Sequence, residues 1–277
     1  MPGAMPPLHR YLGYPVLTAV GRVFFRSPCG DFHCGLRGFD RRAILDLDLQ
    51  ASGIEFASEM VVKATIRKLR ITEVPTTLSP DGRSRPPHLR SWRDGWRHLR
   101  FLLLFSPRWL FLYPGLLLFA LGLTAMALLL PGPLVIKSVV LDIHTLLYAS
   151  LAVVVGLQSI LFWVFTKIYG MREGIVPADP WFNSLLSAAT LEKGLIAGGV
   201  LIMIGLLLGT VALGAWNMVG FGALEPADTM RLVIPSATAI LLAFQIAYGA
   251  FFISVLEIRA TRTISDSAPS RSDSSRG

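Results

Sequence analysis

Four long apolar segments most constrain what this chain can fold into. They lie at Trp109–Leu130, Thr145–Phe165, Gly194–Ala215 and Leu232–Leu256. About 20 helical residues, at about 1.5 Å each, cross the roughly 30 Å of hydrocarbon in a bilayer, and each segment is long enough. The whole chain is 53% hydrophobic and only 16% charged, a balance unlike that of soluble domains. The sequence therefore predicts an α-helical membrane protein with four transmembrane helices.

The excess positive charge lies before these segments. Residues up to Arg108 include 17 Lys and Arg against 9 Asp and Glu, whereas the remainder has 9 of each kind. Loops 131–144 and 216–231 carry one basic residue each, and loop 166–193 and the tail carry more. Because basic residues favour the cytoplasmic side, we expect an integral, multi-pass protein with both termini in the cytoplasm. No nucleic-acid motif accompanies the charge, so no nucleic-acid partner is expected.

A basic, Trp-rich stretch joins the two regions. On a helix from Pro86, one face would carry Leu89, Trp92, Trp96, Leu99 and Leu103, and a stripe of arginines would run beside it. Such a helix is typical of a membrane interface, with Trp at the boundary and guanidinium groups among the headgroups. The predicted interface residues are Trp92, Arg93, Trp96, Arg97 and Arg100. The alternative is an amphipathic helix packed on a soluble core.

The region before this stretch has mixed secondary-structure signals. We expect a helix over 7–25, interrupted near Gly13 and Pro15, and a short helix that Asp40 caps. A longer helix over 54–69 should turn Phe56, Met60, Ala64 and Leu69 inward. Segments 32–39 and 70–78 are predicted to be strands. The Ser-rich tail from Ile264 should be disordered.

Three groups of residues in this region could carry chemistry. Arg37 lies between two glycines and could reach a ligand, or it could be a solvated arginine in a turn. Glu55 and Glu59 share a helix face and could serve as a base or metal ligand, or form a salt bridge with Lys63. The third group is a loop that could hold a phosphate, or merely attract anionic lipids: Gly82, Arg83, Ser84 and Arg85.

Other polar and small residues suggest structural roles. Gln158 and Gln245 lie inside predicted spans, where hydrogen bonding between helices is commoner than lining a pathway. No ionisable residue lies near the centre of a span, which argues against ion or proton transport. Cys29 and Cys34 are too few for a zinc site and are expected to be reduced thiols. Small residues in the third predicted span permit close helix packing, so a homo-oligomer through the spans is possible: Gly194, Gly198 and Gly205.

Several motifs resemble one family. The order is D-x-x-C-G-L-R-G-F from Asp31, G-I-E-F-A-S-E-M-V-V-K-A from Gly53, and I-T-E-V-P-T-T-L-x-P-D-G-R-S-R-P from Ile71, followed by the Trp- and Arg-rich stretch and apolar spans. This resembles the C-terminal half of a family 2 glycosyltransferase, and more narrowly the polyprenyl- or dolichyl-phosphate sugar synthases. The resemblance implies that Asp31 and Glu59 are catalytic and that Arg37, with the Gly82–Arg85 loop, binds the lipid phosphate.

The chain departs from the family at its beginning. The family's GT-A domain has a nucleotide-binding βαβ unit and a metal-binding Asp-x-Asp motif, and no Asp-x-Asp precedes Asp31. We therefore expect no cofactor in this chain, and a divalent metal, Mg or Mn, only in the complete enzyme. The expected domains are the C-terminal half of a GT-A α/β domain over 1–85, an interfacial helix over 86–108, four transmembrane helices over 109–258 and a disordered tail over 259–277.

The resemblance also implies a function. It predicts a truncated membrane glycosyltransferase of the cell envelope that moves a sugar from a nucleotide sugar to a polyprenyl or dolichyl phosphate. Its partners would be the membrane lipid and, in the complete enzyme, the nucleotide sugar. The alternative is a non-catalytic membrane protein that assists translocation of lipid-linked sugars or binds a partner subunit.

Overall fold

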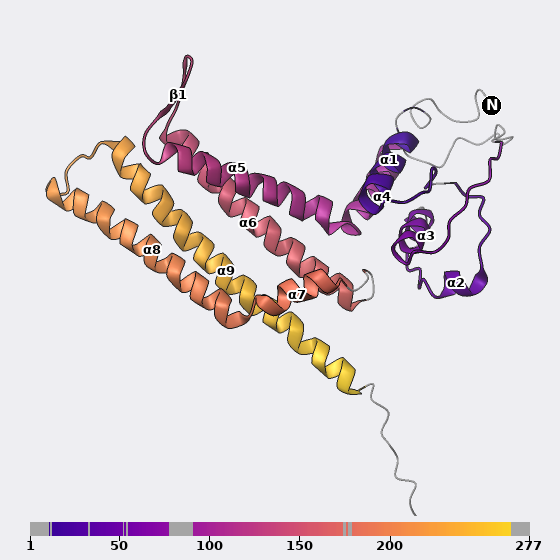
Figure 1. Cartoon of the computed structure of the whole chain (residues 1–277). Coiled ribbons are helices and arrows are strands. Elements are labelled where there is room, and N and C mark those ends of the chain that lie inside the picture. Colours follow the sequence, from indigo (N-terminus) through magenta and orange to yellow (C-terminus); the bar gives the residue numbers. More distant parts are fainter. Residues whose placement is uncertain are drawn as a thin grey trace, which may run out of the picture. The chain divides into compact units, whose positions relative to one another are not determined.

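The structure, a computed structural model, forms two compact units that we describe separately: mainly residues up to Leu110, and mainly residues from Phe111 onward. It describes residues 11, 13–32, 34–51, 53, 55–77, 91–173, 176 and 179–266, and of Tyr14, Ser91, Asp94 and 258–266 only the backbone. The first unit contains α1 (Tyr14–Phe25), α2 (Arg41–Leu45), α3 (Glu55–Ile66) and α4 (Ser91–Leu104), as Figure 1 shows.

The helices of the first unit pack around a small apolar core. Phe32 is fully buried in it, against Gly21 of α1, where a Cβ would come within 2.9 Å of the Phe32 ring. The core also contains Cys29, Val61, Val62, Phe101 and Leu102. Pro15 lies in the first turn of α1, where a proline has no N–H that the helix needs. The predicted interruption of a longer helix near Gly13 and Pro15 is not tested, because residues 7–10 and 12 lie outside the described part.

The two helices predicted after α1 are present. Asp40 caps α2 by accepting a hydrogen bond from the Ala43 N–H at 2.9 Å, as predicted. In α3, Met60 and Ala64 are buried as expected. The prediction was wrong for two flanking residues, because Phe56 is 41% exposed and Leu69, beyond the helix, is 36% exposed.

The predicted strands over 32–39 and 70–78 are not strands where the structure describes them. Residues 34–40 and 69–77 have no regular secondary structure. β-Branched residues favour an extended backbone, but a strand also needs a neighbouring strand to pair its N–H and C=O groups. Within the described part of the first unit there is no sheet, so the expected GT-A α/β layer is not seen there.

Helix α4 has two apolar faces. His98, Phe101 and Leu102 are buried on one of them. At 100° per residue the opposite face carries Trp92, 82% exposed, and Trp96, 59% exposed. The structure therefore combines both alternatives drawn from the sequence, because one face packs on a core and the predicted interfacial face is exposed.

The second unit contains the long helices. A π-helical turn, η2 (Arg108–Leu112), leads into α5 (Tyr113–Leu129), and β1 (Leu134–Ile136) pairs antiparallel with β2 (Val139–Leu141) in a small hairpin. Then follow α6 (Ile143–Arg172), α7 (Pro180–Ala188), α8 (Leu191–Met218) and α9 (Pro226–Asp266). Neither the hairpin nor α7 was predicted. Helix α9 continues to Asp266, past the predicted beginning of the disordered tail, and residues 267–277 lie outside the described part.

Four helical segments are long and apolar enough to cross a membrane, as predicted. They are Arg108–Leu129, Ile143–Arg172, Leu191–Met218 and Pro226–Glu257. In none of them is more than 28% of the apolar window buried inside the protein. Large side chains such as Leu117 and Leu207, 60% and 65% exposed, point outward. Soluble proteins rarely expose so much apolar surface to water, so this is a multi-pass membrane protein.

The spans pack as two pairs, α5 with α6 and α8 with α9, joined through α6 and α9 (Figure 1). Glycines permit the closest approaches. A Cβ on Gly122 of α5 would lie 2.7 Å from the Ala149 carbonyl oxygen of α6. One on Gly205 of α8 would lie 3.0 Å from the Ser236 carbonyl oxygen of α9. A Cβ on Gly194 or Gly198 would also meet atoms of α9, so the three glycines that left an oligomer possible serve packing within the chain.

Polar side chains join the spans at defined points. The Gln245 amide of α9 donates to the Gln158 amide oxygen of α6 at 3.1 Å, so the predicted interhelical role of both residues is confirmed. Arg231, at the start of α9, donates to the Leu129 carbonyl of α5 and pairs with Asp142, which precedes α6. The guanidinium thus satisfies a carbonyl at a helix end that has no intrahelical partner.

Candidate functional site

The candidate site centres on the loop between α1 and α2, which carries Asp31. Hydrogen bonds hold the start of this loop. The Cys29 N–H donates to the Ser27 hydroxyl at 3.3 Å, and the Thr65 hydroxyl oxygen of α3 lies 3.0 Å from the same oxygen. Phe32, next along the chain, is fully buried. Asp31 itself is exposed. The fold thus presents this predicted catalytic carboxylate at the surface of a fixed loop.

Glu73 is a residue of this site that sequence reasoning missed. Its carboxylate oxygen accepts hydrogen bonds from the backbone N–H groups of Gly30 at 2.7 Å and Asp31 at 3.3 Å. A Cβ on Gly30 would lie 3.1 Å from the other Glu73 oxygen, so glycine gives the carboxylate room. Glu73 lies in the I-T-E-V-P motif that begins at Ile71, and this position could have indicated a role in the site. The prediction of a strand over 70–78 did not suggest such a role.

Cys29 lies beside the same carboxylate. Its sulfur lies 3.3 Å from the Asp31 carbonyl oxygen and 3.6 Å from a Glu73 carboxylate oxygen, so both are acceptors for its single S–H proton. Burial and the nearby negative charge of Glu73 raise the pKa of the Cys29 thiol, and the hydrogen bond to Asp31 only partly offsets them. The thiol therefore stays protonated, and both Cys29 and Cys34 are free, as expected from the sequence.

Arg37 ties the loop to α3. Its guanidinium donates to the backbone carbonyls of Cys34 at 2.8 Å, Phe32 at 2.8 Å and Ala57 at 2.6 Å. A guanidinium has five N–H groups, so these bonds engage three of them. Arg37 therefore has a structural role, and binding of a phosphate through its other N–H groups stays a prediction.

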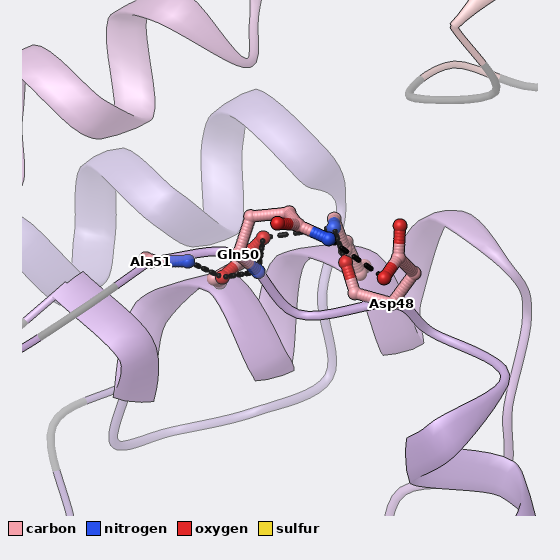
Figure 2. A network of polar contacts seen from close by, with 5 residues as sticks. Asp48, Gln50 and Ala51 are labelled. Atoms are coloured by element: carbon pink, nitrogen blue, oxygen red, sulfur yellow. Dashed lines mark hydrogen bonds and ion pairs between the residues drawn. The ribbon is translucent and has the colours of Figure 1, made fainter.

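Glu59 is buried in a polar network. Its side chain is 2% exposed, and its oxygens accept from the backbone N–H groups of Ala51 at 2.7 Å and Gln50 at 3.0 Å. Lys63 forms an ion pair with it at 2.8 Å and donates to the Asp48 carbonyl. Figure 2 shows the Asp48, Gln50 and Ala51 segment that these contacts hold. The predicted catalytic role is untested, but this geometry makes Glu59 a positioning residue for the segment before α3.

Acid is expected to destabilise the first unit through Glu59. Burial favours the protonated form, but the Lys63 ammonium and the N–H groups of Ala51 and Gln50 outweigh it and hold the pKa of Glu59 below its ordinary value of 4.5. The unfolded chain therefore binds the proton more readily. The stabilisation is complete above pH 4.5 and is lost as the pH falls through the lower folded-state pKa.

The measurement is the urea midpoint for proteolysis of the first unit, in detergent, on both sides of pH 4.5. The Glu59→Gln variant should show a smaller pH dependence than the natural chain. It should not lose all of it, because Arg97 also lowers the pKa of Glu55, against the opposing effect of burial. An equal pH dependence in both proteins would contradict this role of Glu59.

Two polar contacts dock α4 on α3, beside the site. Arg97 binds the Glu55 carboxylate through two nitrogens, at 2.6 and 3.0 Å. The Ser58 hydroxyl lies 3.1 Å from Nδ1 of His98, and both residues are buried. Arg97 therefore serves docking, while Arg93 and Arg100 are also exposed on α4. Contact of these predicted interface residues with a membrane stays a prediction.

The predicted phosphate-binding loop and the expected divalent metal remain to be compared with the structure. The predicted phosphate loop of Gly82, Arg83, Ser84 and Arg85 lies outside the described residues. Among the residues that are described, no group of three or more His, Cys, Asp and Glu side chains could hold a metal ion. These residues therefore do not form a site for the divalent metal expected of the complete enzyme.

The chain is similar to known proteins both in its membrane part and before it. Residues 164–257 match the glycosyltransferase family 2 C-terminal transmembrane region. The chain is 35% identical over 260 residues to the low-salt glycan biosynthesis hexosyltransferase Agl6 of Haloferax volcanii, covering 92% of this chain and 60% of that protein. It is 32% identical over 94 residues to the glycosyltransferase AglJ of the same organism, covering 34% of this chain and 31% of that protein.

No solved structure matches the chain significantly. The chain spans less than two thirds of the length of either relative. The match to Agl6 nevertheless includes most of the chain, and the matched transmembrane region covers α8, the apolar part of α9 and the end of α6. Residues 164–257 are therefore similar to the C-terminal transmembrane region of family 2 glycosyltransferases, and most of the chain is similar to part of a hexosyltransferase.

Proposed function

We propose that this chain is part of a membrane glycosyltransferase that moves a sugar from a nucleotide sugar to a polyprenyl or dolichyl phosphate. The similarity to a hexosyltransferase of glycan biosynthesis supports the transfer of a hexose. The transmembrane region supports an acceptor that resides in the bilayer. We also infer that residues 1–85 contribute to a GT-A domain. Both termini would face the cytoplasm, because segments rich in Lys and Arg favour that side and such segments lie before the first span and after the last.

The single observation that carries this proposal is the double-faced α4. One face is bound to α3 by Glu55 and Ser58, within the unit that carries Asp31. The opposite face exposes Trp92 and Trp96. An exposed Trp face beside arginines suits the boundary between headgroups and acyl chains. A catalytic unit docked in this way would meet a long-chain lipid phosphate at headgroup depth.

The chemistry needs little from the protein beyond positioning and charge. An oxygen of the lipid phosphate forms a bond to the anomeric carbon of the sugar. The bond from that carbon to the nucleotide phosphate oxygen breaks, and the nucleotide leaves with the electron pair. The nucleophile is already anionic, so no base has to remove a proton. The protein must instead align two phosphates that repel each other, which positive side chains achieve.

The chain's residues divide between contact and support in this scheme. Asp31 borders the reacting groups, and Arg83 and Arg85 neutralise the lipid phosphate, with Gly82 and Ser84 allowing its close approach. Glu73 holds the Asp31 backbone through its N–H group, and Glu59 holds the segment before α3. Arg37 fixes the intervening loop. Glu59, Glu73 and Arg37 would then act through other residues.

Replacing Arg85 with alanine should lower sugar transfer while membrane insertion stays intact. A charge-assisted hydrogen bond to phosphate contributes about 1.5–3 kcal/mol, which corresponds to roughly a 10- to 150-fold loss of rate. The assay follows label from nucleotide sugars into polyprenyl phosphate, in membranes containing the chain with any coding sequence that continues in frame before Met1. Arg271→Ala, in the tail, is the matched control. Equal transfer by both variants would remove Arg85 from the site.

A further inference from the structure

Helix α7 is a short helix between two spans, α6 and α8. Its nine residues begin at Pro180, and Asp179 caps it by accepting from the Phe182 N–H at 3.3 Å. A connection between spans does not require a helix. The segment between α8 and α9, which includes the exposed Gly220, contains none. The contacts of α7 therefore indicate what the helix does.

The N-terminus of α7 is latched to α6. Lys167 of α6, whose side chain is 5% exposed, pairs with the Asp179 carboxylate at 2.6 Å. The ammonium also lies 4.2 Å from the centre of the Phe182 ring and 5.4 Å from that of Trp163. A buried ammonium is costly unless it is paired. The carboxylate that caps α7 thus also neutralises a charge on the transmembrane helix.

The other end of α7 is tied to the beginning of α8. The Lys193 ammonium donates to the Ala188 carbonyl, in the last turn of α7, at 2.8 Å. The Thr190 hydroxyl caps α8 by accepting from the Lys193 N–H at 3.4 Å. Both ends of α7 are thereby fixed to spans, so its depth is set by where α6 ends and α8 begins.

The nine residues of α7 form three separate faces. Phe182, 1% exposed, and the half-buried Leu186 pack on the bundle. Trp181 and Leu185 form a second, apolar face and are 66% and 45% exposed. At 100° per residue, the third face lies about 120° from each of the other two. It is polar and exposed and consists of Asn183, Ser184 and Ser187.

We propose that α7 is a membrane-surface helix whose Trp181 and Leu185 side chains enter the boundary between headgroups and acyl chains. The two spans that α7 joins also expose large apolar side chains near their ends, such as Tyr169 of α6 and Ile196 of α8, 55% and 66% exposed. Trp prefers this boundary, and the polar face can meet water. The occupant of the apolar face is therefore lipid.

The side of the membrane on which α7 lies follows from the number of spans before it. Helix α4 precedes the first span, and α7 follows the second. Two crossings return the chain to its starting side. The proposal thus places α7 on the side of the membrane from which the first span starts, and it does not depend on the proposed sugar transfer.

The test compares two labelled positions on the same helix. In a chain with Cys29→Ala and Cys34→Ser, Leu185→Cys and Ser187→Cys are labelled singly with an environment-sensitive fluorophore. The chain is reconstituted into phosphatidylcholine and phosphatidylglycerol vesicles with or without brominated acyl chains. We expect several-fold stronger quenching by brominated lipid at position 185 than at 187, and the reverse order with aqueous iodide. Quenching at 185 by neither agent, as under a second copy or a partner, would overturn the proposal, as would equal quenching at both positions.

The latch has its own variants. Asp179→Asn removes the charge that neutralises Lys167, and the contrast between positions 185 and 187 should then shrink. Lys193→Met releases only the C-terminal tie, leaves the buried pair intact and should narrow the contrast less. If the contrast is unchanged in both variants, neither contact fixes the depth of α7 and that part of the proposal fails. If Asp179→Asn does not fold, the labelled chain with natural Asp179 and Lys193 still tests the contact with lipid.

Discussion

Replacing Glu59 with alanine is expected to unfold or strongly loosen the first unit. The change removes a carboxylate that is 2% exposed, leaves Lys63 without its ion pair and leaves the Gln50 and Ala51 N–H groups without their acceptor. Removing one partner of a buried pair costs about 3–5 kcal/mol, a large part of the stability of a small unit. Pulse proteolysis of the whole chain in detergent, over a series of urea concentrations, measures the change.

Glu55 provides the matched control on the same helix. Its pair with Arg97 is more exposed, 14% and 43% for the two side chains. The Glu55→Ala variant should therefore lose only about 1 kcal/mol or less. Fragment sizes separate cleavage in the first unit from cleavage elsewhere. If Glu59→Ala and Glu55→Ala shift the urea midpoint equally, Glu59 does not have the structural role inferred from its burial.

Replacing Gly156 with valine is expected to separate α5 from α6. A Cβ at this position would lie 2.5 Å from the Phe119 backbone nitrogen and 2.8 Å from its Cα. Backbone atoms cannot move aside as a flexible side chain can, so the helices must shift. Overpacking of this kind costs about 1–3 kcal/mol and sometimes more. The Tm of the detergent-solubilised chain should fall substantially.

Gly214→Val is the control for this experiment. Gly214 lies in α8, and a Cβ there would meet nothing within 4 Å. The two substitutions change helix propensity alike, so their difference in Tm reports the crossing of α5 and α6. Equal Tm values for both variants would show that these helices do not approach each other as closely as described.

The transmembrane part could be predicted well from the sequence. The bilayer requires long apolar helices, which leave a strong pattern. The paired glutamines, Gln158 and Gln245, also followed from the rarity of such residues in spans. The span ends were less predictable. Lys167 and Arg231 were assigned to loops, but each lies within a helix and pairs with a carboxylate that is distant in the sequence, Asp179 and Asp142 respectively.

The candidate site was only partly predictable, because roles of single side chains depend on tertiary partners. Asp40 capped its helix as expected since a cap uses neighbours in the sequence. The role of Glu73 could not be read in the same way, because the Gly30 N–H that it binds lies 43 residues away. For Glu59 the sequence left open a base, a metal ligand or a salt bridge with Lys63, and only the fold shows that its carboxylate is buried against Gln50 and Ala51.

The most direct test of the central claim is transfer of label from a panel of nucleotide sugars into polyprenyl phosphate. Membranes would contain the chain, expressed with any in-frame coding sequence before Met1, and the matched Asp31→Asn variant. We predict that label enters the lipid phase from at least one nucleotide sugar and that Asp31→Asn greatly reduces it. Absence of labelled lipid with every donor, from a chain that is inserted in the membrane, would contradict the claim and favour a non-catalytic membrane protein.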